Sequence, residues 1–216
     1  IFPTATVFQY DYLNDDIFLI DNPNMTSQFI KPKMPKKLYD DLRNPDISWI
    51  IFINPPFATS NKSGKNTGKT SKDDVSMTDI QKIMTDNGLG ETSRELFAQF
   101  LYRISKEFAG KEAYLGLFSK IKYINSNNDQ KLRNDFFTYK FERGFIFSSE
   151  TFVGTKGKFP VGFLVWNLSK KQHIEDQEII LDVYNADCEK IGTKPIPTME
   201  RSAFLSKWVE RHRNSY

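Results

Sequence analysis

The sequence predicts an open α/β sheet, in which strands and helices alternate along the chain. Residues 48–53 (SWIIFI) form an apolar run of strand length, as expected of a buried strand in a parallel sheet that is covered on both faces. Residues 91–108 carry apolar and aromatic side chains at helical spacing, which predicts a helix with one face packed on the sheet. Further strand-like and helix-like segments follow in alternation, and this alternation is typical of an open α/β sheet.

Before the buried strand, the sequence predicts one strand and one short helix. Residues 4–10 (TATVFQY) are β-branched and aromatic, so we expect a strand that ends at Asp11. Residues 35–43 (PKKLYDDLR) predict a short helix. The buried strand at 48–53 stops at the Asn-Pro-Pro-Phe segment of residues 54–57, because proline cannot donate a hydrogen bond to a ladder.

A long polar segment comes next, and a second series of elements follows it. From residue 58 to about residue 90 the composition changes to Ser, Thr, Asn, Gly and Lys, which predicts a long loop with a short helical piece at 76–84. After the helix at 91–108, the pattern predicts strands at 113–118, 143–148, 160–168 and 178–184, helices at about 128–139 and 199–211, a turn near Asp187 and a basic segment through Lys194.

Composition narrows the class of protein. With 216 residues, 39% hydrophobic and 14% aromatic, the chain is long enough for one compact domain, with or without a small appendage. The single cysteine, Cys188, excludes an internal disulfide, and two histidines give no metal-ligand cluster. No run approaches the roughly 18 apolar residues of a membrane-spanning helix, and no export signal opens the chain. We therefore expect a cytoplasmic protein without a metal site, whose net charge of +3 permits but does not require a polyanionic partner.

Asn54, Pro55, Pro56 and Phe57 are the candidate catalytic residues. In an open α/β sheet, ligands bind beyond the carboxyl ends of the strands, and this segment directly follows a buried strand. An exocyclic amine on a nucleobase is a poor nucleophile because its lone pair is delocalised into the ring. Hydrogen bonds accepted from that amine by the Asn54 side-chain oxygen and the Pro55 carbonyl favour a tetrahedral nitrogen, whose lone pair then points at an incoming methyl group. Phe57 is expected to stack on a base that has been flipped out of a duplex.

An apolar strand followed by Asn-Pro-Pro-aromatic resembles the fourth motif of the amino methyltransferases, which act on adenine N6, cytosine N4, or glutamine and guanine amides. Asp11 after a strand matches the family's third motif, whose acidic side chain contacts the adenine of S-adenosylmethionine. Leu96 to Ile104 resembles the helix that follows the catalytic loop. Residues 147–152, followed by the strand at 160–168, resemble the eighth motif, in which a phenylalanine stacks on the other face of the flipped base.

Phe152 is the candidate for that second stacking residue, with Phe147 and Phe159 as competitors. The resemblance spans roughly residues 4–168 and is closest to the methylases of restriction-modification systems. It implies a class I (Rossmann-like) S-adenosylmethionine-dependent methyltransferase sheet, DNA adenine-N6 methylation as the activity, and double-stranded DNA as the partner. Residues 1–168 are accordingly expected to form a partial methyltransferase catalytic-motif region, and residues 169–216 a C-terminal strand pair and helix of unassigned role.

The chain departs from this family at its N-terminal end. A class I methyltransferase cradles the methionine end of its cofactor on a glycine-rich turn after the first strand, yet no glycine precedes Gly64 in this sequence. We therefore expect an N-terminally incomplete sheet. Cofactor binding is expected to depend on a missing N-terminal segment or on a companion chain.

The polar loop carries four lysines that are candidates for contacts with DNA phosphates: Lys62, Lys65, Lys69 and Lys72. A loop that is merely solvated is the alternative. The glycines at positions 64 and 68 are separated by three residues, whereas a phosphate-binding loop of the nucleoside triphosphatases requires four. We therefore do not expect nucleoside triphosphate binding there.

Two other functions remain open at this point. The same tetrapeptide serves the methylation of protein glutamine amides and of RNA guanine amines, but those families usually have Tyr where this chain has Phe57, and they lack the match at Phe152. Without the glycine-rich turn, the chain could also serve as a non-catalytic nucleic-acid-binding module.

Overall fold

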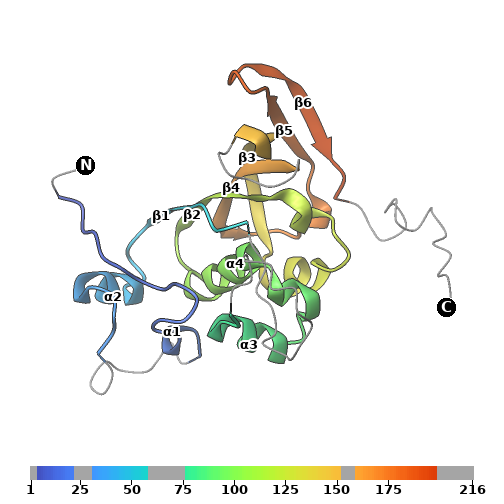
Figure 1. Ribbon diagram of the computed structural model, residues 1–216. Coiled ribbons are helices and arrows are strands. Elements are labelled where there is room, and N and C mark those ends of the chain that lie inside the picture. Colours follow the sequence, from blue (N-terminus) through green and yellow to red (C-terminus); the bar gives the residue numbers. More distant parts are fainter. Residues whose placement is uncertain (1–3, 22–30, 58–75, 152–158, 199–216) are drawn as a thin grey trace, which may run out of the picture.

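The computed structural model describes residues 4–21, 31–57, 76–151 and 159–198, which form a mixed α/β fold around one six-stranded sheet (Figure 1). The strands are β1 (Trp49–Ile53), β2 (Ala113–Lys120), β3 (Tyr139–Ser148), β4 (Pro160–Lys171), β5 (Ile179–Tyr184) and β6 (Lys190–Ile196). The α-helices are α1 (Phe18–Asp21), α2 (Lys36–Arg43), α3 (Asp79–Asp86) and α4 (Leu96–Glu107). The α/β architecture expected from the sequence is confirmed.

The sheet combines parallel and antiparallel pairs in the order β1-β2-β4-β3-β5-β6. β1 is parallel to β2, and β3 is parallel to β5. β4 lies between β2 and β3 and is antiparallel to both, and β6 is antiparallel to β5. Among the described strands β1 is therefore an edge strand, with β2 as its one partner.

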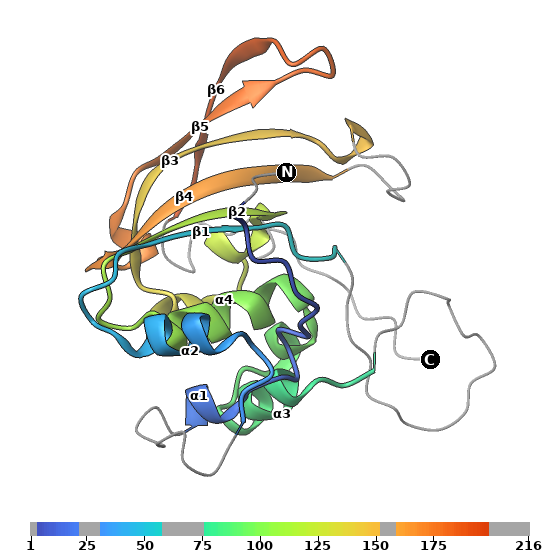
Figure 2. The same ribbon diagram turned by 90° about the vertical axis from the view of Figure 1, so that its left-hand side faces the viewer.

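The helices cover one face of the sheet (Figure 2). On that side, α4 buries Phe97, Leu101 and Ile104 in the core. Trp166 of β4 is fully buried, and its indole N–H donates to the Tyr123 hydroxyl at 3.1 Å. Because full burial of a large apolar side chain contributes about 1.5–3 kcal/mol, this helix-covered face supplies most of the stabilising contacts.

The other face of the sheet carries no helix within the described residues (Figure 2). Ile50 and Phe52 of β1 lie on it and are 89% and 67% exposed. Phe52 packs on Phe163 of β4 with ring centroids 5.5 Å apart, and Phe163 packs on Phe118 of β2 at 4.6 Å. We call this surface the aromatic face. The expectation that the strand at 48–53 is covered on both faces is therefore wrong for the described part of the chain.

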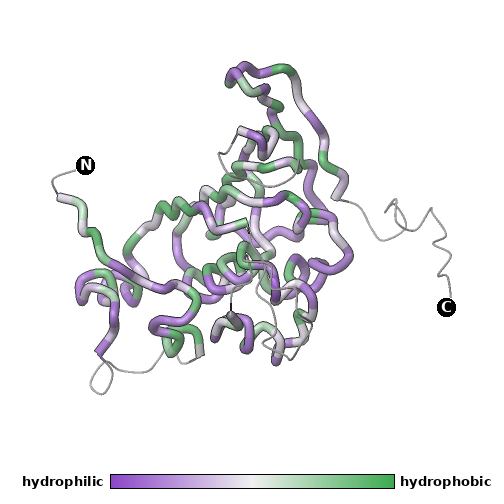
Figure 3. The backbone as a smooth tube through the Cα atoms, in the orientation of Figure 1, coloured by the Kyte–Doolittle hydropathy of each residue, from purple (hydrophilic) through white to green (hydrophobic). Residues whose placement is uncertain are grey.

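The helices and strands differ in hydropathy (Figure 3). β1 is largely hydrophobic, whereas α2 is largely hydrophilic and buries Tyr39 alone. Two pairs one turn apart, Lys36 with Asp40 and Lys37 with Asp41, lie on the exposed side of α2. None of the helices in the described part of the chain is long and apolar enough to cross a membrane.

Most of the predicted elements are present, and two of them differ. The helix expected at 91–108 begins at Leu96, because Gly90–Arg94 forms a 3-10 helix instead. The helix expected at about 128–139 is shorter: residues 130–136 are helical, with a π-helical turn at Leu132–Phe136, and β3 begins at Tyr139. The strands and the short helix that were predicted elsewhere correspond to β2, β3, β4, β5 and α3, and the basic segment forms β6.

The strand predicted at 4–10 is also wrong. Residues 4–9 are exposed and pair with no strand of the sheet. An extended segment is stable as a strand only when its backbone N–H and C=O groups have ladder partners, and residues 4–10 form no ladder with a described strand. Asp11 consequently lies in a turn rather than at a strand end. The helix predicted at 199–211 lies outside the described residues.

Candidate active site at the carboxyl edge of the sheet

The Asn-Pro-Pro-Phe segment emerges at the carboxyl end of β1, where the sequence predicts it. The parallel register places Ile53 beside Leu117, so that Asn54 lies next to the last residues of β2. β4 runs in the opposite direction, and its Val161 pairs with Lys120 at the end of β2. The ends of β1 and β2 and the start of β4 therefore meet, and we call this region the carboxyl edge.

The four residues of the segment differ in exposure. Pro55 is buried and Phe57 is half-buried, whereas Asn54 and Pro56 are exposed. The proline rings fix the backbone, and the buried Pro55 anchors it to the body of the protein. Within the described part of the chain the Asn54 carboxamide has no hydrogen-bond partner. Asn54 is thus exposed at the end of β1, on a backbone that the two following prolines restrict.

Phe57 and Phe159 form an aromatic pair beside Asn54. Their ring centroids lie 5.9 Å apart at an interplanar angle of 71°, which is an edge-to-face contact. The backbone N–H of Phe159 donates to the Ser149 hydroxyl at 3.1 Å, and the N–H of Ser149 donates to the Phe159 carbonyl at 2.9 Å. Because Ser149 is fully buried, these two hydrogen bonds hold Phe159 in place.

Among the three phenylalanines proposed for the second stacking position, the structure places Phe159 next to Phe57. Phe147 lies on the aromatic face instead, where its ring is 6.3 Å from that of Phe118. Phe152 lies outside the described residues, so its stacking role stays a prediction. The same holds for the loop lysines Lys62, Lys65, Lys69 and Lys72.

Lys120 is a residue of the carboxyl edge that the sequence analysis missed. Its ammonium nitrogen lies 5.5 Å from the centre of the Phe159 ring and 3.9 Å from a carboxylate oxygen of Glu95. Glu95 also binds Lys122, at 2.6 Å. The sequence does contain one indication of Lys120: it is a basic residue just beyond the predicted strand at 113–118, and strand ends form this edge.

Asp11 is exposed, and its carboxylate fixes the shape of its own turn. It accepts the backbone N–H of Leu13 at 3.1 Å and the side-chain amide of Asn14 at 2.7 Å. The backbone N–H of Asp11 donates to a carboxylate oxygen of Asp15 at 3.0 Å. The turn that carries Asp11 is thus closed by local hydrogen bonds, and its carboxylate retains exposed lone pairs.

A buried arginine of α4 attaches this turn to the body of the protein. The Arg103 guanidinium is fully buried and donates to Glu107 at 2.7 Å and to the Asp15 carbonyl at 2.8 Å. It also donates to the Tyr12 carbonyl and lies 4.3 Å from the centre of the Tyr12 ring. The Tyr12 hydroxyl donates to Glu107 at 2.6 Å. Burial, together with the nearby Glu107 carboxylate, raises the pKa of Tyr12, so the hydroxyl remains a proton donor at neutral pH.

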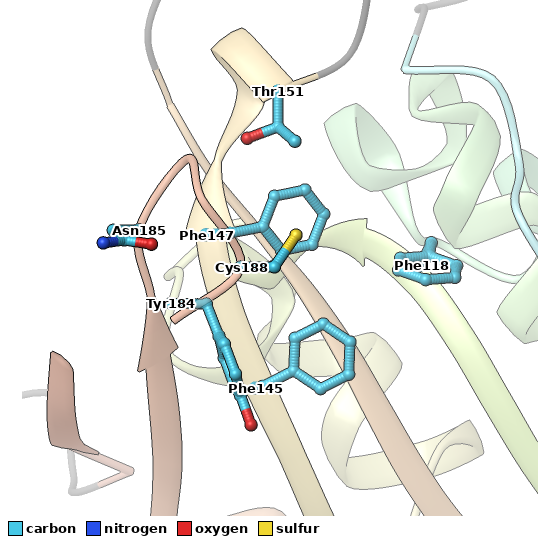
Figure 4. Close-up of a pocket in the computed structure, with 7 residues that line it drawn as sticks. All are labelled: Phe118, Phe145, Phe147, Thr151, Tyr184, Asn185 and Cys188. Carbon is cyan, nitrogen blue, oxygen red and sulfur yellow. The ribbon is translucent and has the colours of Figure 1, made fainter. Parts of the chain in front are cut away.

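An apolar cavity of about 360 Å³ opens on the aromatic face (Figure 4). Phe145 contributes to its wall, with ring centroids 6.0 Å from Phe147 and 5.5 Å from Tyr184. The exposed Cys188 lies at its rim, in a turn where its φ is +62°. No group of three or more His, Cys, Asp or Glu that could hold a metal ion occurs within the described ranges.

No protein-family model matches the sequence, and no curated protein matches it. Among solved structures, the chain is similar to one described as a DrdV–DNA complex studied by cryo-electron microscopy, with a TM-score of 0.48 and 12% sequence identity. That similarity covers 83% of this chain and 20% of the other, so the chain spans about a fifth of that protein's length. A similarity at this level carries no argument about activity.

The buried Arg103–Glu107 ion pair is expected to affect the free energy of unfolding. Replacing Arg103 by Leu leaves the buried Glu107 carboxylate without its cation, so the free energy of unfolding is expected to fall by about 3–5 kcal/mol. The second single variant is Glu107→Leu, and the double variant Arg103→Leu, Glu107→Leu is expected to recover part of the loss seen in Arg103→Leu. Chemical denaturation measures all three proteins, with Lys82→Leu, which removes a surface ion pair, as a control that changes stability by about 0.5 kcal/mol or less. A double variant that loses the sum of both single changes contradicts the coupling.

Proposed function

We propose that this chain carries the methyl-acceptor half of a DNA adenine-N6 methyltransferase, of the kind found in restriction-modification systems. The observation that carries the proposal is the exposed Asn54 at the carboxyl end of a parallel strand, held by a buried Pro55 and flanked by the Phe57–Phe159 pair. Ligands of open α/β sheets bind at such strand ends. A polar acceptor beside aromatic rings suits a flat ring that bears an amine.

In this proposal, Asn54 and Pro55 act on the amine of the target base. The Asn54 side-chain oxygen and the Pro55 carbonyl accept its two N–H groups, which favours a tetrahedral nitrogen and localises the lone pair. The rigidity of the two prolines holds both acceptors in place before the reaction, so that little reorganisation is needed. Phe57 stacks on the extruded base and offsets part of the cost of removing it from the duplex.

Among the described residues, Phe159 packs against the ring of Phe57. Its ring lies edge-on to that of Phe57, which fixes the orientation of the stacking surface. Its own position is fixed by the two hydrogen bonds to Ser149. Phe152, the candidate from the sequence, remains the proposed ring for the opposite side of the base.

S-adenosylmethionine is the proposed methyl donor, and the described residues fit only one end of it. The exposed Asp11 carboxylate can accept a hydrogen bond from the cofactor's adenine amine. The neighbouring residues Tyr10 and Tyr12, together with β1, line a cavity of about 480 Å³. Within these 216 residues no glycine precedes Gly64, so the described residues before β1 supply no glycine-rich turn for the methionine end.

The open side of the sheet supports the proposal that a companion segment completes the cofactor site. β1 has one unpaired edge among the described strands, and such an edge is a template for another strand. On the same strand Ile50 and Phe52 are largely exposed, and contiguous exposed apolar surface marks an interaction site. A segment that pairs with β1 and covers the aromatic face satisfies both features.

The role of Asn54 is testable in the complete enzyme, meaning this chain with the companion segment. Asn54→Ala is expected to lower the rate of N6-methyladenine formation in duplex DNA by about two orders of magnitude, because one preorganised acceptor at the reacting nitrogen is lost. Since Asn54 is exposed, thermal stability should not change.

Transfer of a radiolabelled methyl group followed by nucleoside analysis measures this rate. Asn127→Ala, at an exposed asparagine away from the segment, serves as the matched control. A fully active Asn54→Ala variant would end the assignment. Label found in protein glutamine or in RNA guanine, with none in DNA adenine, would transfer the proposal to those substrates.

Binding of S-adenosylmethionine to the isolated chain tests the proposed division of the cofactor site. Isothermal titration of the 216-residue chain alone with S-adenosylmethionine at micromolar concentration is expected to show no heat of binding, because Asp11 supplies only the adenine end. The complete enzyme is expected to bind it, and more weakly after Asp11→Ala. Tight stoichiometric binding to the isolated chain would contradict the proposed division of the cofactor site.

A further inference from the structure

Lys120 occupies an unusual position at the carboxyl edge. It is the last residue of β2 and pairs with Val161 near the start of β4, so the sheet itself fixes its backbone. Its ammonium group lies 5.5 Å from the centre of the Phe159 ring, and the Phe159 ring contacts Phe57. The cation is therefore one ring away from the surface on which the base is proposed to stack.

The charges around Lys120 do not cancel. Glu95 lies close to two ammonium groups, at 2.6 Å from Lys122 and at 3.9 Å from Lys120. Only the shorter contact is a hydrogen bond, so the Glu95 carboxylate belongs mainly to Lys122. One carboxylate facing two ammonium groups leaves about one unit of positive charge, and this charge resides on Lys120.

The N–H donors of the Lys120 ammonium group are not used by the described residues. An ammonium group has three N–H donors, and no described residue accepts a hydrogen bond from that of Lys120. Its side chain is 27% exposed, so an anion can reach it. The cation–π contact with Phe159 restricts the side chain without using a donor.

We propose that Lys120 binds a backbone phosphate of the DNA nucleotide whose base is extruded onto Phe57. This inference rests on the proposed function and adds a second contact to the same nucleotide. Within a nucleotide, the phosphate is joined to the base through a single sugar, so a base held beside Phe57 brings its own phosphate into the neighbourhood of Lys120. The phosphate contact carries no sequence information and serves to position the extruded nucleotide.

The salt dependence of DNA binding distinguishes this contact from a merely structural lysine. Each phosphate neutralised by a protein cation releases bound counterions, so the loss of one such contact reduces the slope of log affinity against log salt by about one. A lysine that only packs on Phe159 can change affinity through the shape of the site, but it leaves the slope unchanged.

The experiment measures equilibrium binding of the complete enzyme to a target duplex over a series of salt concentrations. Lys120→Ala is expected to weaken binding by roughly tenfold and to reduce the salt slope by about one, and Lys120→Arg is expected to restore both. Lys190→Ala is the control, since Lys190 is a more exposed lysine on β6, at the opposite edge of the sheet, where it pairs with Asp182 of β5 at 2.8 Å. It is expected to change neither quantity.

Two results overturn the inference in distinguishable ways. If the parent enzyme binds the duplex and Lys120→Ala leaves the salt slope unchanged, Lys120 does not contact phosphate, and the proposed function stands without it. If the parent enzyme shows no binding to DNA at any salt concentration, the proposed function fails and the inference fails with it.

Discussion

The pairing of β2 with two different neighbours is the constraint on which the candidate site depends. Its parallel pairing with β1 brings the carboxyl end of β1, and with it Asn54, to the end of β2. Its antiparallel pairing with β4 brings the start of β4, and with it Phe159, to the same place. Phe57 and Phe159 lie more than 100 positions apart in the sequence. They become neighbours because β2 pairs with both β1 and β4. Among the described residues, the buried Pro55 and the Phe159 ring hold the Asn-Pro-Pro-Phe segment in place.

The two faces of the sheet have opposite roles in this account. The helix-covered face holds the core and the Arg103–Glu107 network, which attaches the turn of Asp11 to α4 through a guanidinium that is fully buried. The aromatic face exposes large apolar side chains, and the edge of β1 beside it is unpaired among the described strands. In the described part of the chain the aromatic face is uncovered, which agrees with the companion segment proposed above. Stability and assembly are therefore assigned to different sides of the same sheet.

Local sequence patterns predicted the elements whose character depends on their own residues. The apolar run at 48–53 and the helical spacing around Leu101 identified β1 and α4, and two consecutive prolines located the end of β1. The strand predicted at 4–10 failed because a strand depends on a ladder partner, which no local pattern supplies. In the site, Asn54 and Phe57 could be predicted from their own segment. Phe159 could not be separated from the other phenylalanines, and the position of Lys120 beyond a predicted strand could not reveal its contact with Phe159, because the antiparallel insertion of β4 that makes them neighbours is a long-range feature of the sheet.

The central claim is that an adenine leaves the duplex and binds at the Phe57–Phe159 pair beside Asn54, and base fluorescence tests it most directly. With 2-aminopurine in place of the target adenine, emission is expected to rise when the complete enzyme binds the duplex, because the base leaves its stacked neighbours. The rise should be largest in Phe57→Leu, where the ring that would stack on the extruded base is absent, while affinity falls by about 1–3 kcal/mol. 2-Aminopurine placed two base pairs away serves as the control and should stay dark. Unchanged emission at the target position on saturation with enzyme, or a Phe57→Leu variant that binds as tightly as the parent, would contradict the account.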